Sequence, residues 1–456
     1  MTRTAWTFLI TAMAVFMSAL DNLVVTTALP VIRADFGATL SELEWMVNAY
    51  TLTFAVLLLT GAALGDRFGR KRLFIIGLTV FTIGSTAAAL SGTSTELIVA
   101  RAIQGIGGAI VTPLSLTILS AAVSPERRAV ALGAWGGIAG LAIAIGPLVG
   151  GAIAEGLDWQ WIFWVNVPIG LVAIPLAYVR LEESYGPSQR LDLPGLGLVS
   201  AGLLAIVWGL VKGNELGWTD PQIVGSLGVG ALLTGTFLAW EARTAAPMLP
   251  LHLFRSRAFA AANVVSMLMT FGMFGSIFLL AQFFQVVQGL SPLDAGIRTL
   301  PWTMAPMVVA PLAGIFADRL GVRNLIVAGQ ALLAAGILWL ALATTTDVSY
   351  GDLVVAFALA GVGMGLTFAP ISTMALASVT ARERGVASGA NNTIRELGVA
   401  IGIAVLASIF SSAGDYSSRQ AFVDGLKPAV IVGACIVAVG AVVALWLPRQ
   451  PSTPVD

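Results

Sequence analysis

The stretch ALGDRFGRKR, Ala63 to Arg72, decides how this chain is organised, because an altered copy, GIFADRLGVR, occupies Gly314 to Arg323. Each copy follows a long apolar run and combines an acidic residue with glycine and arginine. A loop that occurs twice, so far apart in the sequence, indicates an internal duplication. The pair therefore predicts two halves with the same architecture.

The composition of the chain is that of a membrane protein. Of its 456 residues, 57% are hydrophobic and 11% are charged, whereas soluble domains carry about 25% charged residues. Lys plus Arg and Asp plus Glu both number 24, so the net charge favours neither a nucleic acid nor an acidic partner. The single histidine, His252, excludes a multi-histidine metal site, and the single cysteine, Cys435, excludes an internal disulfide.

Apolar runs long enough to cross a bilayer account for most of the sequence. A span needs about 17 to 25 predominantly apolar residues, and charged residues or Pro/Gly clusters bound each run. The predicted fold is therefore an all-α polytopic membrane protein with fourteen transmembrane helices. They are residues 6–29, 45–64, 73–91, 97–121, 130–154, 161–179, 194–211, 222–240, 258–284, 296–317, 324–343, 351–377, 386–409 and 427–447.

Lysine and arginine concentrate in alternate loops. If the N-terminus is inside, one face collects most of them, including Arg67, Arg70, Lys71 and Arg72. The positive-inside rule places that face in the cytoplasm. We therefore expect both termini to be cytoplasmic, in a multi-pass protein of the cell membrane (inner or plasma).

The duplicated loop divides the helices into six, two and six. When the run 45–64 is matched to the run 296–317, the first six helices correspond to the last six, and the two between are an insertion. Transporters are commonly built from such repeats, with the substrate site near the midplane between them. The chain is expected to be a monomer with an N-terminal six-helix bundle at 1–180, the insertion and its loops at 181–257, a C-terminal bundle at 258–447 and a tail at 448–456.

An aspartate, Asp21, interrupts the first apolar run. It shares a helical stripe with small and polar residues, because positions 7, 11, 14, 18, 21 and 25 are Thr, Thr, Ala, Ser, Asp and Val. A charged group at the bilayer centre costs about 2.5 to 3.5 kcal/mol, so such residues usually mark ion pathways or paired charges. Burial also disfavours the charged carboxylate, which allows the group to load and unload a proton. We expect Asp21 to face the interior as a proton carrier; the alternative is a permanent ion pair that serves packing.

Arg101 is the expected partner of Asp21. Asp21 lies near the end of an outward-running helix and Arg101 near the start of an inward-running one, so both lie roughly 7 to 12 Å below the same membrane surface. Arg101 also shares its helix face with Gln104, Gly105 and Gly108, which suits an interior surface. The similar depth allows contact between the two side chains.

A second charged pair, Arg395 and Glu396, lies inside the thirteenth run. Adjacent residues point in different directions on a helix, so the two side chains are not expected to neutralise each other. Glu396 is a candidate second proton site, or a counter-charge for a cationic substrate. A salt bridge to another helix is the alternative.

Polar side chains inside the apolar runs are candidates for lining a substrate cavity. They can bind substrate, or they can join neighbouring helices by hydrogen bonds, which is a common role in membranes. The candidates are Asn48, Tyr50, Gln104, Asn166, Asn391, Asn392 and Arg395.

Glycines cluster inside the runs, as in GIGGA at 105–109, GPLVGGAIA at 146–154 and GVGMG at 361–365. A phosphate-binding loop needs a strand, a Lys and a Ser or Thr that these segments lack, whereas small residues let membrane helices approach closely. We therefore expect no nucleotide or other cofactor. An ion gradient is the predicted energy source.

These segments resemble the major facilitator superfamily, and within it the fourteen-helix drug:proton antiporters. The loop motif of that superfamily is present as GDRFGRKR, although Ala62 stands where the motif begins with Gly, and the fourth-helix motif is present as RAIQGIGGA at 101–109. The fifth-helix antiporter motif is present as GPLVGG, although Ala142 replaces a usual Gly. The matching residues are Asp66, Arg67, Gly69, Arg70 and Arg72 in the loop, Arg101, Gln104 and Gly105 in the fourth helix, and Gly133, Gly146, Pro147, Gly150 and Gly151 in the fifth.

Further segments extend the resemblance over nearly the whole chain. LDNLVVTTALP at 20–30 is similar to the first-helix signature of the fourteen-helix group, with Asn22 and Thr27 departing from its commonest form. WQWIFWVNVPIG, LFRSRAF and NNTIRELG also resemble segments of that group. The resemblance is specific for the family and much less specific for the substrate.

The resemblance implies alternating access, with Asp21 as proton carrier and Arg101 as its modulator. It also makes the Asp66 loop, with its copy at Asp318 and Arg319, a gate, and it gives the fifth-helix Gly/Pro segment the task of shaping the contact between bundles. A carboxylate and several arginines at a cytoplasmic turn can pair with helix ends in one state and release them in another. The same arginines can also serve only to fix the topology.

The expected function is proton-coupled export of hydrophobic or cationic small molecules, such as drugs and toxic compounds, in exchange for protons. One alternative is a dedicated exporter of a single metabolite or natural product that uses the same mechanism. An enzyme or a non-transporting sensor would need a cluster of convergent polar groups, which the sequence does not show.

Overall fold

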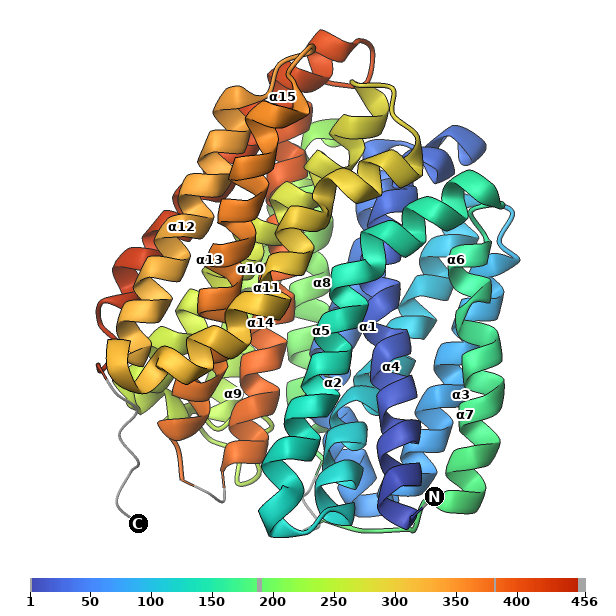
Figure 1. Cartoon of the computed structure of the whole chain (residues 1–456), viewed down its shortest axis with the longest axis vertical. Helices are drawn as coiled ribbons and strands as arrows, with labels where there is room; N and C mark the ends of the chain where they lie inside the picture. The colour runs from blue at the N-terminus through green and yellow to red at the C-terminus, as the bar shows by residue number, and fades with distance from the viewer. Residues whose placement is uncertain (1, 187–190, 381–382, 450–456) are drawn as a thin grey trace. The chain divides into compact units, whose positions relative to one another are not determined.

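The computed structural model describes the chain except for residues 1, 187–190, 381–382 and 450–456. It also leaves out the side chains of Asn22, Pro125, Glu126, Arg128, Ala129 and Asp318. The described part is helical and contains no strand (Figure 1). Within it, 14 helices are long and apolar enough to cross a membrane. The predicted number of spans is therefore confirmed.

Most helices begin and end within about five residues of the predicted limits, but the first ends at Phe36 instead of 29, and the last begins at Arg419 instead of 427. They are α1 (Arg3–Phe36), α2 (Leu40–Phe68), α3 (Arg70–Ala89), α4 (Ser94–Ala122), α5 (Pro125–Gly156), α6 (Trp161–Trp164), α7 (Asn166–Arg180), α8 (Leu193–Leu216), α9 (Pro221–Glu241), the 3-10 helix η1 (Leu251–Arg255), α10 (Arg257–Val286), α11 (Pro292–Leu320), α12 (Val322–Ala343), α13 (Tyr350–Ala377), α14 (Arg384–Ala413) and α15 (Arg419–Ala444).

The sixth predicted span, 161–179, is confirmed as the stretch Trp161–Arg180, but it is interrupted at Val165, where the helices α6 and α7 meet. Pro168 explains the break: proline has no N–H to donate to the carbonyl of Trp164, and its ring crowds that carbonyl. The break makes Asn166 the first residue of α7.

The chain forms two compact units. The first comprises Met1–Ser200 with Ala245–Met248, and the second comprises Ala201–Thr244 with Leu249–Asp456. The division falls inside α8, so most of α8 and all of α9 belong to the second unit. The domain limits expected from the duplication remain a prediction.

Corresponding helices pack in the same pairs within each unit. In the first unit α2 and α3 pack on α4, and α1 packs on α5; in the second α11 and α12 pack on α13, and α10 packs on α14.

The turns that close the two copies of the repeated loop also agree. Gly69 (φ 108°) and Gly321 (φ 81°) both have the left-handed φ that favours glycine. Each donates its N–H to a carbonyl four residues earlier, Gly65 at 3.0 Å and Ala317 at 2.9 Å.

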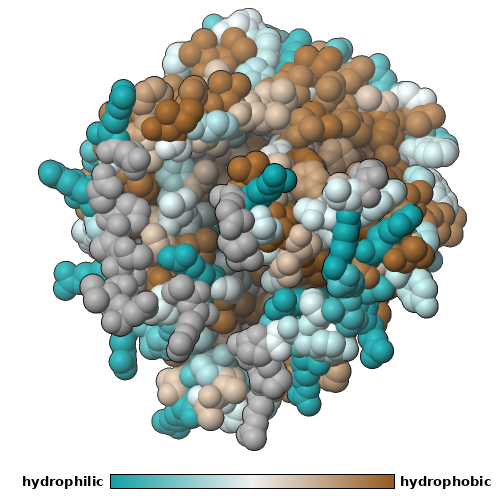
Figure 2. All heavy atoms as spheres, turned by 60° about the horizontal axis from the view of Figure 1, so that its bottom comes forward, coloured by the Kyte–Doolittle hydropathy of each residue, from teal (hydrophilic) through white to brown (hydrophobic). Residues whose placement is uncertain are grey.

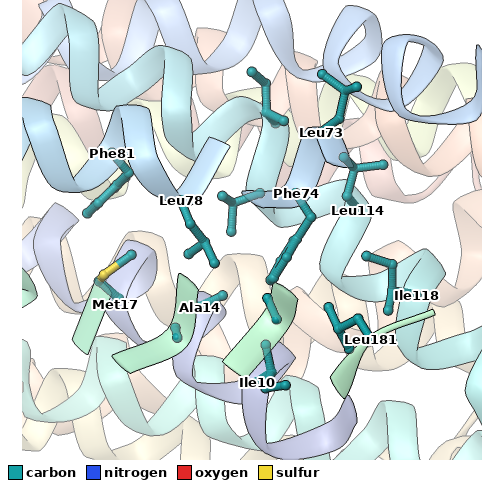
Figure 3. Close-up of a cluster of buried hydrophobic side chains, with 14 of the residues drawn as sticks. Ile10, Ala14, Met17, Leu73, Phe74, Leu78, Phe81, Leu114, Ile118 and Leu181 are labelled. Carbon is teal, nitrogen blue, oxygen red and sulfur yellow. The ribbon is translucent and has the colours of Figure 1, made fainter. Parts of the chain in front are cut away.

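An apolar cluster holds the helices of the first unit around the candidate site. Ile10 and Met17 of α1, Phe74 and Phe81 of α3, and Leu114 of α4 are among its buried members (Figure 3). Tyr50 of α2 belongs to the same cluster and also contacts Arg101. The packing of the cluster therefore positions the polar groups beside it.

Large apolar side chains also lie on the outside of the helices. Leu171, Leu232 and Ile315 are each more than half exposed, as expected of surfaces that face lipid in a membrane protein. Figure 2 turns the lower end of Figure 1 forward, the end at which the chain begins. Hydrophilic side chains stand out around this face, and hydrophobic surface is visible along its upper edge. The helix ends at this face therefore carry much of its polar surface.

Candidate functional site: a buried carboxylate network

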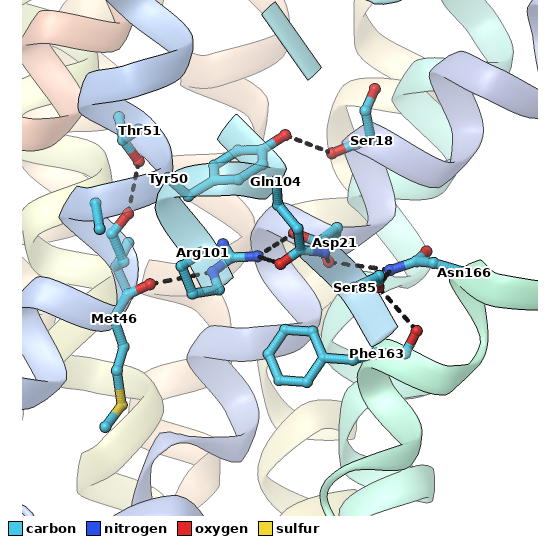
Figure 4. A network of polar contacts seen from close by, with 12 residues as sticks. Ser18, Asp21, Met46, Tyr50, Thr51, Ser85, Arg101, Gln104, Phe163 and Asn166 are labelled. Atoms are coloured by element: carbon cyan, nitrogen blue, oxygen red, sulfur yellow. Dashed lines mark hydrogen bonds and ion pairs between the residues drawn. The ribbon is translucent and has the colours of Figure 1, made fainter. Parts of the chain in front are cut away.

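Asp21 lies at the centre of a hydrogen-bonded network within the first unit and is 2% exposed (Figure 4). Its Oδ2 pairs with Nη1 of Arg101. Its Oδ1 accepts hydrogen bonds from Nε2 of Gln104 at 3.1 Å and from Nδ2 of Asn166 at 3.1 Å. Donors aimed at a carboxylate in a site shielded from water stabilise its charged form. Two predictions are confirmed: Asp21 faces the interior, and Arg101 is its partner.

Arg101 is fully buried and makes contacts beyond Asp21. Its Nη1 donates to Oε1 of Gln104 at 3.0 Å, and its Nε donates to the carbonyl of Met46 at 3.1 Å. The guanidinium carbon lies 4.4 Å from the centroid of the Tyr50 ring, a cation–π distance. Each charge of the pair thus depends on the other, because an unpaired charge in such a site is costly.

The predicted polar stripe of α1 is buried along its whole length, from Thr7 to Val25. Residues off the stripe are partly buried as well: Ile10, Met17 and Val24 are buried, whereas Leu9 is 37% exposed. The stripe is therefore not the only buried side of α1. What distinguishes Asp21 is its set of partners on α4 and α7.

The substrate-cavity candidates of the first unit divide into two groups. Gln104 and Asn166 are partners of Asp21, and Tyr50 contacts Arg101 and donates its hydroxyl to the carbonyl of Ser18 at 3.4 Å. Asn48 differs, because it is fully buried in α2 and neither polar atom of its amide has a hydrogen-bond partner in the described part of the chain.

The candidates of the second unit include one that joins helices. Asn391 of α14 donates from Nδ2 to Oδ1 of Asn263 at 3.1 Å and to Oγ of Ser266 at 3.2 Å, both on α10. This is the helix-joining role that was one of the two alternatives. The next residue, Asn392, is partly buried.

The prediction that Arg395 and Glu396 do not neutralise each other is wrong. Nη2 of Arg395 lies 3.7 Å from Oε1 of Glu396, which makes an ion pair between neighbours in the sequence. Their Cα–Cβ bonds diverge, but the long, flexible side chains bend toward each other. The guanidinium of Arg395 also lies 4.8 Å from the centroid of the Phe368 ring on α13. The proton-coupling and substrate roles of the pair remain predictions.

The repeated loop of the first unit is held by the segment that follows α7. Nε of Arg70 lies 2.7 Å from Oδ1 of Asp66, and the carbonyl of Asp66 accepts from the N–H of Gly186 at 3.0 Å. The carboxylate of Glu183 accepts from the backbone N–H groups of Lys71 at 2.9 Å and Arg72 at 3.2 Å. An acid placed there satisfies the free N–H groups at the start of α3.

The other loop residues contribute less within the described part. The guanidinium of Arg67 lies over the ring of the adjacent Phe68 at 5.2 Å. In the second copy Arg319 is exposed at the end of α11, and the side chain of Asp318 lies outside the described residues. The gating role of both copies stays a prediction.

The glycines of α5 allow this helix to lie directly against α1 next to Asp21. A Cβ atom on Gly146 would lie 2.8 Å from Cβ of Leu23, and one on Gly150 would lie 2.7 Å from the carbonyl oxygen of Val24. Pro147 and Gly151 are buried in the same stretch, and α5 remains helical through Pro147. The segment thus shapes the contact between α1 and α5, inside the first unit.

Gly150→Val is expected to destabilise the protein by about 1 to 3 kcal/mol, because the added side chain forces α5 away from α1. Thermal unfolding of the purified protein in detergent measures the effect. Gly137→Val on the same helix is the matched control, since no atom of another helix lies within 4 Å of its added Cβ. Equal unfolding temperatures for the two variants would contradict the role assigned to Gly150.

Ser85, Phe163 and Glu183 take part in these networks but were not identified from the sequence. Oγ of Ser85 donates to the carbonyl of Phe163 at 2.9 Å and accepts from Nδ2 of Asn166 at 3.1 Å. A lone serine in an apolar run carries no signal of such a role. The acidic pair Glu182–Glu183 after the sixth span was the only available signal for Glu183.

In the described part of the chain, no group of three or more His, Cys, Asp or Glu side chains is placed to hold a metal ion. The carboxylate of Asp21 is bonded to nitrogen donors of Arg101, Gln104 and Asn166.

Comparison with known proteins places the chain in a family. The family model for the Major Facilitator Superfamily matches residues 11–403 and 264–456. A tetracenomycin C resistance and export protein of Streptomyces glaucescens is 34% identical over 408 residues, which cover 89% of this chain and 76% of that protein. The multidrug resistance protein Stp of Mycobacterium tuberculosis is 35% identical over 408 residues, which cover 89% of this chain and 76% of that protein. A methylenomycin A resistance protein of Bacillus subtilis is 33% identical over 91% of this chain and 89% of that protein.

Solved structures share the fold at low sequence identity. An auto-inhibited peptide transporter of the POT family matches with a TM-score of 0.72 and 16% identity, over 100% of this chain and 98% of that one. A bacterial homologue of the human lysosomal transporter Spinster matches with a TM-score of 0.71 and 16% identity, over 100% and 99% of the two chains. These likenesses establish the architecture alone.

Proposed function

The chain belongs to the major facilitator superfamily and is a multi-pass transporter of the cell membrane, and we propose that it exports hydrophobic or cationic small molecules in exchange for protons. Its relatives are named for multidrug resistance and for resistance to individual antibiotics, which supports export. The observation that carries the proton coupling is the buried Asp21 carboxylate, held by Arg101, Gln104 and Asn166.

The proposed cycle turns on the charge of Asp21. In the ionised form the carboxylate attracts Arg101 and accepts two further hydrogen bonds. A proton from outside neutralises the carboxylate, so that the ion pair is lost and the network loosens. If the two conformations of the transporter bind the proton unequally, its uptake shifts the population toward the inward-facing form. Release of the proton inside restores the pair.

Transport by the purified protein in vesicles with an imposed pH gradient tests the proposal. A panel of hydrophobic dyes, cationic and neutral, reports which compounds move. We expect export of at least one class to depend on the gradient and to stop when a protonophore collapses it. Transport of the panel at equal rates with and without the gradient would contradict proton coupling.

A second candidate function is the export of one dedicated compound. It is favoured by those relatives that are named for a single antibiotic, tetracenomycin C or methylenomycin A. The same dye panel separates the two: a multidrug exporter moves several unrelated dyes, whereas a dedicated exporter moves none of them and requires its own compound.

A further inference from the structure

The amide of Asn166 takes part in the Asp21 network through its NH2 group only, and its carbonyl oxygen makes no bond there. Its Nδ2 donates to Oδ1 of Asp21 and to Oγ of Ser85, both at 3.1 Å. Its Oδ1 is buried and has no hydrogen-bond partner in the described part of the chain. A buried acceptor without a partner is costly, so it requires an explanation.

The neighbours fix the present orientation of this amide. The hydroxyl of Ser85 gives its hydrogen to the carbonyl of Phe163 at 2.9 Å, so its oxygen is left to accept. An ionised Asp21 can also only accept. Both groups therefore need the NH2 end of Asn166, and the carbonyl end is turned away (Figure 4).

The amide of Gln104, unlike that of Asn166, is hydrogen-bonded at both ends. Its Nε2 donates to Asp21 at 3.1 Å, and its Oε1 accepts from Nη1 of Arg101 at 3.0 Å. Turning this amide over would face a donor toward Arg101 and an acceptor toward the carboxylate, and both bonds would be lost. If the amide of Asn166 turns over, only its two bonds from Nδ2 to Asp21 and Ser85 are lost, because its Oδ1 makes none.

We propose that Asn166 is a positioning residue for the proton step: it donates to ionised Asp21 and turns over to accept from the acid once Asp21 is protonated. The inference rests on the proposed function, since it concerns the same carboxyl group. A protonated carboxyl is a donor at one oxygen, and the unpaired Oδ1 of Asn166 supplies the acceptor. The amide thus sets the pH at which Asp21 takes up its proton.

Few other charged or titratable groups face this carboxyl. Arg101 of α4 is in contact with it, the Tyr50 phenol of α2 lies against Arg101, and Glu44 stands on α2 two residues before Met46. The helices α3, α5 and α7 carry charged residues only near their ends, and α6 carries none. Those near the ends are Arg70, Lys71 and Arg72 on α3, Glu126, Arg127, Arg128 and Glu155 on α5, and Arg180 on α7.

Removing the amide is expected to favour protonation of Asp21. The bond to the ionised form is charge-assisted and about twice as strong as the neutral bond to the acid, so the ionised form loses more. The carboxyl then takes up its proton at a higher pH. For Asn166→Leu the midpoint of proton uptake is expected to rise by about one pH unit.

Infrared difference spectroscopy on the whole protein in vesicles measures this midpoint without requiring transport. The C=O stretching band of the protonated acid is followed against pH and is assigned by its absence from Asp21→Asn. Gln330→Leu, which replaces a fully buried amide of the second unit, is the matched control and should titrate as the unaltered protein does. Asn166→Ser, whose hydroxyl is too short to reach Asp21, should shift in the same direction if Asn166→Leu fails to fold.

The outcomes separate this inference from the proposed function. A rise in midpoint for the Asn166 variants alone supports the positioning role. An unchanged midpoint in these variants, with a band that titrates normally in the unaltered protein, overturns the role and leaves proton carriage by Asp21 intact. A protein in which the Asp21 band never titrates would overturn the proposed function, and the role of Asn166 with it.

Discussion

Asp21→Asn is expected to abolish transport driven by a pH gradient. The amide cannot take up a proton in the relevant range. Its NH2 group would replace one of the two acceptor oxygens and would face either the donors of Gln104 and Asn166 or that of Arg101. In vesicles with an imposed pH gradient, substrate flux should fall to the level of vesicles without protein. Substrate-for-substrate exchange at equal pH on both sides should persist, because that exchange needs no proton.

The persistence of exchange separates uncoupling from misfolding. Asp347→Asn makes the same chemical change at an exposed loop position and should transport as the unaltered protein does. If Asp21→Asn still couples flux to the gradient, Asp21 is not the proton carrier. In that case Glu396, the other acid predicted to couple protons, would be the next residue to test.

Arg101→Ala is expected to have the second largest effect, in two measurable ways. It leaves the carboxylate of Asp21 buried without its charge partner, and breaking a buried ion pair from one side typically costs about 3 to 5 kcal/mol. Thermal unfolding should therefore occur at a lower temperature. The carboxyl also loses the cation that favours its ionised form, so the pH profile of transport should move to higher pH.

A double-mutant cycle tests whether the two effects arise from one interaction. In Asp21→Asn combined with Arg101→Ala no charge is left unpaired, so the loss of stability should be smaller than the sum of the two single losses. Arg243→Ala removes an exposed arginine and should leave both stability and the pH profile unchanged. Additive losses in the cycle would show that Asp21 and Arg101 do not stabilise each other.

Much of the fold could be predicted because hydrophobic length is a local property. Each span must cover a bilayer with residues adjacent in the sequence, so fourteen apolar runs predict fourteen helices. The break between α6 and α7 was missed, although Pro168 marks it, because hydropathy alone does not register a lost backbone donor. The pairing of Arg395 with Glu396 was also misjudged, because direction at Cβ does not determine where a long side chain ends.

The candidate site could be predicted in part, residue by residue. Asp21 and Arg101 were identifiable because a charge in an apolar run is conspicuous, and the similar depth of the two residues allowed contact between them. The contact of Asn166 with Asp21 could not be predicted, because an amide in an apolar run can either bind substrate or join helices. The roles of Ser85 and Glu183 depend on packing between segments far apart in the sequence. Ser85 of α3 meets Asn166 of α7, and Glu183, after α7, meets the start of α3.

By itself the sequence determined that the chain spans a membrane fourteen times, that its halves are duplicated, and that one acid must find a partner away from lipid. These follow from the cost of placing polar groups in hydrocarbon, which acts on each segment separately. Only the tertiary structure decided which donors surround Asp21, which way the Asn166 amide is turned and which of its ends is left unpaired. These depend on the directions of side chains from different helices, since a hydrogen bond requires donor and acceptor to be brought together within about 3 Å.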